Sequence, residues 1–319
     1  MSDKSPIIHH QSTMYVKLLL TAVFWGGTFI AGRQVAQHLG PFSIAFLRFA
    51  VASAFLLSLA RIREGRLPFP GKGQIIPVVL LGLTGVFTYN VLFFKGLRLI
   101  EASRAALIVA TCPAFIAIAS SLLLKEKLSL TKAIGIPLSV FGAVVVISKG
   151  RLSQLTTGGV GWGELCILGC VLSWAAYSLI GKVVMGRLSP LVSVAYSSLI
   201  GAAALFVPAA LYDSLASNLH LATWLDWTSI VYLAVCGTVI GFVWFYEGVK
   251  AVGPTRAGLF INFVPISAVV LGFLILHEQI TWSLAVGAAL VLSGVCLTNR
   301  TPRAGAAGVR RQEVKKAGR

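Results

Sequence analysis

The chain has 319 residues, of which 57% are hydrophobic and only 12% are charged, and its formal net charge is +17. Soluble domains carry charges on about one-quarter of their residues, so this composition excludes an ordinary soluble fold. Seven of the 27 lysines and arginines lie in the segment 300–319, and many others lie between apolar runs. Such a distribution is typical of charges that orient a membrane protein rather than bind nucleic acid.

Ten apolar runs approach the length of about 20 residues that a membrane-spanning helix needs. We expect helices at approximately Tyr15–Val35, Phe42–Ala60, Ile75–Leu97, Ala102–Leu124, Ala133–Ser148, Gly163–Val183, Leu191–Leu211, Trp227–Val249, Ala257–Leu276 and Trp282–Leu297. The first run is too long for the apolar core of a signal peptide, so we expect it to be retained.

The segment 94–126 has a second copy at 246–278. Gly96, Arg104, Pro113 and Glu126 correspond to Gly248, Arg256, Pro265 and Glu278, each 152 residues later. Upstream the offset is 149, which aligns Trp25 with Trp174. A constant offset through such different residue types indicates a duplicated half-chain. We therefore divide the chain into an N-terminal tail (1–14), a first repeat (15–149), a linker (150–161), a second repeat (162–299) and a basic C-terminal tail (300–319).

Each repeat holds five predicted spans, so the second repeat must enter the membrane from the opposite face. The predicted fold is all-α, with ten transmembrane helices forming two inverted five-helix repeats around a central cavity. Most lysines and arginines fall on the side of the N-terminus, so the positive-inside rule predicts that both termini are cytoplasmic. Gly135 and Gly142, and their counterparts Gly287 and Gly294, predict close helix packing.

Ionisable side chains within apolar runs are costly and mark candidate functional positions. Arg48 lies about 10 Å from the outer boundary at 1.5 Å per residue. It faces a pathway, forms a structural ion pair, or extends toward the outer headgroups. Glu247 is the best-placed carboxylate for proton coupling, because burial favours the protonated form of a carboxyl group. An interfacial position is the alternative, and its counterpart Lys95 is expected at the opposite face, too distant for an ion pair.

Pro113 and Pro265 lie near the middle of the fourth and ninth runs. A proline inside a helix removes a backbone hydrogen bond, and transporters use broken helices to build binding sites at the membrane midplane. Thr111 and Asn262 lie on the preceding turns, so polar groups and loosened backbone coincide there. We expect both breaks to line a cavity, with a purely structural kink as the alternative.

Further polar and aromatic side chains at a similar depth complete the candidate substrate site. They are Trp25, Thr28, Tyr89, Asn90, Trp174, Tyr177, Ser178 and, nearer the inner face, Trp244. Aromatic rings with polar tips suit an amphipathic metabolite, although each ring alone is equally compatible with packing. The five cysteines lie in apolar runs, and no metal site, cofactor motif or catalytic constellation is evident. The sequence therefore does not predict an enzyme.

The motif FWGGTF at 24–29, the LRF at 47–49 and the repeated pairing of a mid-helix proline with a terminal glutamate resemble the EamA family of the drug/metabolite transporter superfamily. The resemblance covers about 15–300. It implies a basket of helices around a cavity in a bacterial inner membrane, and export or exchange of amino acids and other metabolites. By this resemblance, the lining would include Trp25, Tyr89, Asn90, Thr111, Trp174, Tyr177, Trp244 and Asn262.

Together these patterns predict a secondary active exporter of a small amphipathic metabolite, such as an amino acid or a derivative, that works by alternating access. A phosphorylated-sugar or nucleotide-sugar exchanger is an alternative that needs converging cations, and only Arg48 is near. Multidrug efflux fits the aromatic residues equally well. Outside transport, a membrane-embedded enzyme or scaffold remains an alternative. The expected partners are a small-molecule substrate and the lipid bilayer, and the chain is a monomer or a homodimer.

Overall fold

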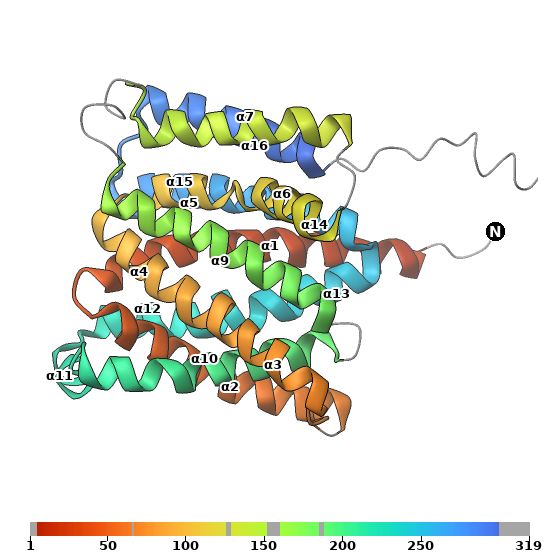
Figure 1. The fold of residues 1–319 in the computed structure, drawn as a ribbon, viewed down its shortest axis with the longest axis vertical. Coiled ribbons are helices and arrows are strands. Elements are labelled where there is room, and N and C mark those ends of the chain that lie inside the picture. Colours follow the sequence, from red (N-terminus) through yellow and green to blue (C-terminus); the bar gives the residue numbers. More distant parts are fainter. Residues whose placement is uncertain (1–4, 66, 126–128, 152–159, 185–187, 300–319) are drawn as a thin grey trace, which may run out of the picture.

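A computed structural model describes residues 5–65, 67–125, 129–151, 160–184 and 188–299 (Figure 1). Among these residues, ten helical stretches are long and apolar enough to cross a membrane. The elements before residue 151 are α1 (Ser5–Ala36), α2 (Pro41–Glu64), α3 (Lys72–Leu81), η1 (Gly82–Thr88), α4 (Tyr89–Leu99), α5 (Ala102–Val109), α6 (Cys112–Leu124) and α7 (Leu130–Ile147).

The later elements are α9 (Trp162–Val184), α10 (Pro190–Leu211), α11 (Leu215–Leu221), α12 (Trp224–Tyr232), η2 (Leu233–Ile240), α13 (Gly241–Val252), α14 (Pro254–Ile261), α15 (Phe263–Leu276) and α16 (Trp282–Asn299). The ten predicted spans are confirmed, and each overlaps its observed helix. One boundary differs, because α1 is helical from Ser5 and so includes most of the segment assigned to the N-terminal tail. The basic segment 300–319 lies outside the described residues.

The third and eighth spans each contain a π-helical segment that the sequence did not predict. η1 lies between α3 and α4, and η2 lies between α12 and α13. The two segments occupy matching places in the two halves, since Gly85 and Gly237 are 152 residues apart. A π-helical turn widens the helix and is frequent at functional sites.

Helix packing follows the same plan in both halves of the chain. α1 packs against α13 and α15, and its counterpart α9 packs against α4, α5 and α6. α2 packs against α10, while α7 packs against α16 at one edge of the bundle (Figure 1). α1 begins and α16 ends on the same side of the molecule (Figure 1). The first helix of each half therefore packs against helices of the other half, as expected for two repeats related by a two-fold axis.

Glycines let α7 and α16 approach closely. A Cβ atom on Gly294 would lie 2.3 Å from the backbone nitrogen of Ser139, and one on Gly142 would lie 2.6 Å from that of Val291. Both distances are far below van der Waals contact, so any larger residue must push the helices apart. The predicted close packing through these glycines is confirmed.

This packing predicts that Gly294→Ala destabilises the protein by roughly 1–3 kcal/mol, because the added methyl overpacks a backbone contact. The matched control is Gly258→Ala in α14, where a Cβ atom meets nothing within 4 Å. Thermal unfolding in detergent measures both variants. Equal unfolding midpoints for the two variants would contradict this account of the α7–α16 contact.

Candidate functional site

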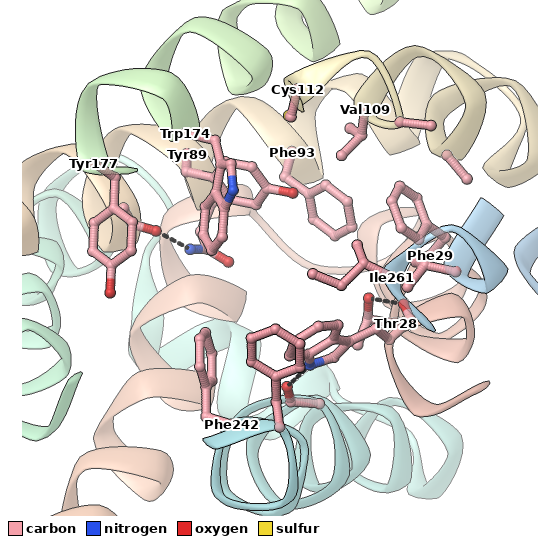
Figure 2. Close-up of a pocket in the computed structure, with 18 of the residues that line it drawn as sticks. Thr28, Phe29, Tyr89, Phe93, Val109, Cys112, Trp174, Tyr177, Phe242 and Ile261 are labelled. Atoms are coloured by element: carbon pink, nitrogen blue, oxygen red, sulfur yellow. Dashed lines mark hydrogen bonds between the residues drawn. The ribbon is translucent and has the colours of Figure 1, made fainter. Parts of the chain in front are cut away.

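A central cavity of about 370 Å³ lies among the helices of both halves. Its lining contains ten of the residues singled out from the sequence: Trp25, Thr28, Arg48, Tyr89, Asn90, Pro113, Trp174, Tyr177, Asn262 and Pro265. Figure 2 shows Tyr89, Trp174 and Tyr177 on one side of this space and Thr28 and Phe29 on the other. The fold therefore gathers residues from distant parts of the chain around one space.

Four other candidates lie outside the lining. Thr111 and Ser178 donate hydrogen bonds to carbonyls of their own helical turns, those of Ile108 (2.7 Å) and Trp174 (2.8 Å). Short hydroxyl side chains commonly make such local bonds. Thr28 makes the same kind of bond to the carbonyl of Trp25 and does line the cavity, so the bond alone does not decide which way a hydroxyl side chain faces.

Trp244 is the third of these, and its ring packs 5.8 Å from that of Phe24. Its helix instead presents Phe242, Phe245 and Tyr246 to the cavity. The fourth is Glu247, which follows Tyr246 on the same helix.

Aromatic rings form one continuous wall of the cavity. The ring of Trp174 lies 5.0 Å from that of Tyr177, in a stacked arrangement, and 5.5 Å from that of Tyr89. Tyr89 in turn stacks on Phe93 at 5.8 Å, and Phe93 meets Phe29 edge to face at 5.1 Å. Rings at these separations stabilise one another. The wall therefore offers a preformed apolar surface to a ligand.

Among the described residues that line the cavity, Arg48 is the only one with a charged side chain. Only 8% of its surface is exposed. Its Nη1 donates to Oδ1 of Asn90 at 3.0 Å, while Nε and Nη2 both donate to Oγ1 of Thr238 at 3.2 Å. None of the ion pairs found among the described residues involves Arg48. Of the arrangements that the sequence left open, the structure shows a cavity-facing guanidinium fixed by neutral groups.

The π-helical segments hold the partners of Arg48 in place. Asn90 donates through Nδ2 to the carbonyls of Val86 (2.9 Å) and Gly85 (3.3 Å), and Thr238 donates through Oγ1 to that of Leu233 at 3.0 Å. These bonds orient the amide and hydroxyl oxygens as acceptors for the guanidinium. A single threonine in an apolar run gives no sequence signal that it will bind an arginine. Thr238 was therefore not among the sequence candidates.

Both proline-containing helices are broken beside the cavity. α5 ends at Val109 and α6 begins at Cys112, while α14 ends at Ile261 and α15 begins at Phe263. Pro113 and Pro265 have no N–H group, so the carbonyls four residues earlier, at Val109 and Ile261, lose their helical donors. Both of these residues line the cavity. The structure therefore places two interrupted helices, one from each half, against the same space.

Glu247 forms ion pairs at one end of the bundle. Its carboxylate lies 2.9 Å from Nζ of Lys17 and 2.8 Å from Nη2 of Arg63, which joins α13 to α1 and α2. The side chain is 26% exposed, and two cations neutralise its carboxylate. The sequence left Glu247 open as a coupling carboxylate or an interfacial residue, and its exposure and partners agree with an interfacial position. Coupling through Glu247 stays a prediction. Lys95 makes no contact with it and lies over the ring of Phe42 at 5.4 Å.

Glu278 lies at the opposite end of the bundle. Its carboxylate accepts hydrogen bonds from the backbone nitrogens of Ala102 (2.7 Å) and Ser103 (2.9 Å) at the start of α5, and lies 3.5 Å from Nε of Arg33. Arg33 also donates to the carbonyls of Leu97 and Ile100. This network ties the end of α15 to α1, α4 and α5.

The lining of the cavity reaches toward both ends of the bundle. It includes Val295, about one helical turn from the end of α16, and Val194, about one turn from the start of α10. Toward the Glu278 end it includes Ala106, about one turn from the start of α5.

Several lining residues were not among the sequence candidates. They include five phenylalanines and two serines: Phe29, Phe49, Phe93, Phe242, Phe245, Ser197 and Ser198. Phenylalanine is ordinary in an apolar run, so it gives no signal by itself. The repeat offset supplies one, because Phe93 and Phe245 are 152 residues apart and both line the cavity.

Comparison with known proteins agrees with this architecture. The model of the EamA-like transporter family matches residues 12–148 and again residues 161–300. The uncharacterized transporter YyaM of Bacillus subtilis is 29% identical over 282 residues, which cover 88% of this chain and 92% of that protein. A probable terminal-alkyne amino-acid exporter of Streptantibioticus cattleyicolor is 28% identical over 286 residues, covering 89% and 92% of the two chains.

A solved crystal structure also superposes on this fold with a TM-score of 0.61 at 21% sequence identity, covering 95% of this chain and 99% of the other. At this identity the likeness concerns the fold alone. The helical bundle with a cavity at two broken helices defines a multi-pass membrane protein of the transporter type. The chain belongs to the EamA-like transporter family, whose model matches it twice.

Proposed function

We propose that this protein is a secondary active exporter of a small amphipathic metabolite, such as an amino acid or a derivative of one, in the plasma membrane. The observation that carries the proposal is the central cavity, which joins an aromatic wall to one buried guanidinium. Such a site combines apolar contact with a few fixed polar groups, as small-molecule sites generally do. The similarity to a probable amino-acid exporter supports this substrate class.

Alternating access explains how the cavity serves transport. The exchanged packing of α1 and α9 supports two inverted repeats, which can present one site to either side of the membrane. By the positive-inside rule, the end of the bundle where α1 begins faces the cytoplasm. At the other end, Glu278 joins α15 to α1 and α5 through Arg33 and the backbone of Ala102. We therefore propose that the substrate enters from the cytoplasmic end.

The alternative functions fit the cavity less well. A phosphorylated sugar needs several cations around its phosphate, whereas the described lining has Arg48 alone. The same charge repels the lipophilic cations that many multidrug exporters carry. A scaffold needs no internal cavity, and the family match favours transport over a membrane-embedded enzyme.

Counterflow in proteoliposomes tests the substrate class. Vesicles preloaded with an amino acid should accumulate the labelled form, and Trp174→Ala should reduce the rate at least about tenfold, because the central ring of the aromatic wall is lost. Trp162→Ala is the matched control, since that side chain is 78% exposed and lies outside the lining. Exchange restricted to sugar phosphates, or equal loss in both variants, would contradict the proposal.

The orientation of the cavity can be tested with Cys112, which lines it and carries a free thiol. In a variant that keeps Cys112 as its only cysteine, a small membrane-impermeant thiol reagent should react faster in inside-out vesicles than in intact cells. Saturating substrate should slow the reaction, because it occupies the same space. A faster reaction from outside the cell would overturn the assigned sidedness.

A further inference from the structure

Arg48 has hydrogen-bonding capacity that its described partners do not use. A guanidinium carries five N–H donors, and the bonds to Asn90 and Thr238 account for three of them, one each from Nε, Nη1 and Nη2. One N–H on each Nη therefore remains. A buried charge without an ionic partner is costly, so the structure maintains a cationic centre that an anion would complete.

The remaining donors suit a carboxylate. Two N–H groups of one guanidinium can bind both oxygens of a carboxylate, an arrangement that is stronger than neutral hydrogen bonds. No aspartate or glutamate is present among the described lining residues to occupy this place. The anion must therefore come from the cavity, where the substrate binds.

The two helix breaks supply candidate acceptors for a positively charged group beside the same cavity. The carbonyls of Val109 and Ile261 have lost their helical donors to the prolines that follow them, and both residues line the cavity. Free carbonyls at unwound helix ends are suited to bind cations in transporters. An α-ammonium group can therefore be accepted without a carboxylate side chain in the lining.

The aromatic wall indicates what the rest of the substrate is. Tyr89, Trp174 and Tyr177 lie next to one another on one side of the cavity, as Figure 2 shows. Rings of this size favour an aromatic or large apolar side chain. A small or strongly polar side chain would leave their faces uncovered.

We propose that Arg48, positioned by Asn90 and Thr238, binds the carboxylate of an α-amino acid, while the aromatic wall holds an aromatic or large apolar side chain and the helix breaks accept the ammonium. This inference rests on the proposed transport function and names its substrate class. It makes Arg48 the residue that distinguishes carboxylates from their neutral analogues.

The first part of the test uses the wild-type protein. Counterflow of labelled phenylalanine is measured in proteoliposomes in competition with phenylalanine, phenylalaninamide, N-acetylphenylalanine and glycine. Phenylalanine should inhibit about 10- to 100-fold more strongly than phenylalaninamide, the range expected for hydrogen bonds to a charged group. Glycine and N-acetylphenylalanine should also be weaker. Equal inhibition by phenylalanine and its amide would overturn the role of the carboxylate.

The second part uses Arg48→Gln and Arg48→Lys. Arg48→Gln should remove the preference for phenylalanine over phenylalaninamide, whereas Arg48→Lys should keep part of it, since it retains the charge but not the planar pair of donors. Arg98→Gln is the matched control, because Arg98 is exposed on α4 and lies outside the lining. Unfolding midpoints show whether each variant is folded. If Arg48→Gln does not fold, the competition between phenylalanine and phenylalaninamide on the wild-type protein still tests whether the carboxylate is recognised.

The possible outcomes distinguish failure of this inference from failure of the proposed transport function. Exchange of phenylalanine with an unchanged preference in Arg48→Gln would refute the inference and leave amino-acid transport standing. Exchange of some other cargo, with no exchange of any amino acid, would refute the proposed substrate class and the inference together. Loss of the preference for phenylalanine over its amide in Arg48→Gln, but not in Arg98→Gln, would support both the inference and the proposed substrate class.

Discussion

The burial of one guanidinium is the constraint on which the centre of this protein depends. A charged side chain within the membrane is expensive and needs polar partners. Arg48 obtains them from Asn90 and Thr238, which reach it from the third and eighth spans. Those partners are in turn fixed by carbonyls of η1 and η2. The two irregular segments thus hold a costly charge in a fixed position beside the cavity.

The duplicated plan explains why irregular features meet in one place. Each half supplies a π-helical segment and a proline-broken helix, and both sets border the cavity. Irregular backbone in a membrane is tolerated where it lines a cavity or is covered by protein. Meanwhile α7 and α16 are regular, pack through their glycines at the edge and supply a firm frame. Regular helices therefore supply close packing at the edge, and irregular helices line the cavity.

The two ends of the molecule use charge in different ways. At one end Glu278 is 8% exposed, and its carboxylate binds backbone nitrogens as well as Arg33. At the other, Glu247 is more exposed and binds the side chains of Lys17 and Arg63. Partly exposed pairs of side chains contribute little to stability, whereas a buried carboxylate with several donors is held firmly. The two ends therefore differ in how firmly their charged groups are held.

Much of this arrangement follows from the sequence by simple rules. Pro113 and Pro265 mark the helix breaks because proline lacks a donor, and Gly142 and Gly294 mark a close helix contact because no side chain fits there. The π-helical segments were not predictable, because tertiary packing rather than local composition decides where a helix widens. Ser178 and Trp244 were predicted to line the cavity but lie outside it, for a related reason. Several aromatic or polar residues share one helical turn, and only packing selects which of them faces the cavity.

The most direct test of the account is the distance between Arg48 and a bound amino acid. Solid-state NMR can measure it, with phenylalanine carrying 13C at its carboxylate and the protein carrying 15N in its arginine guanidinium groups. A carboxylate held by Arg48 predicts strong dipolar dephasing from 15N at hydrogen-bond range, about 4 Å or less between carbon and nitrogen, and loss of that signal in Arg48→Lys. Phenylalanine that is bound but shows no dephasing in the wild-type protein would contradict the account.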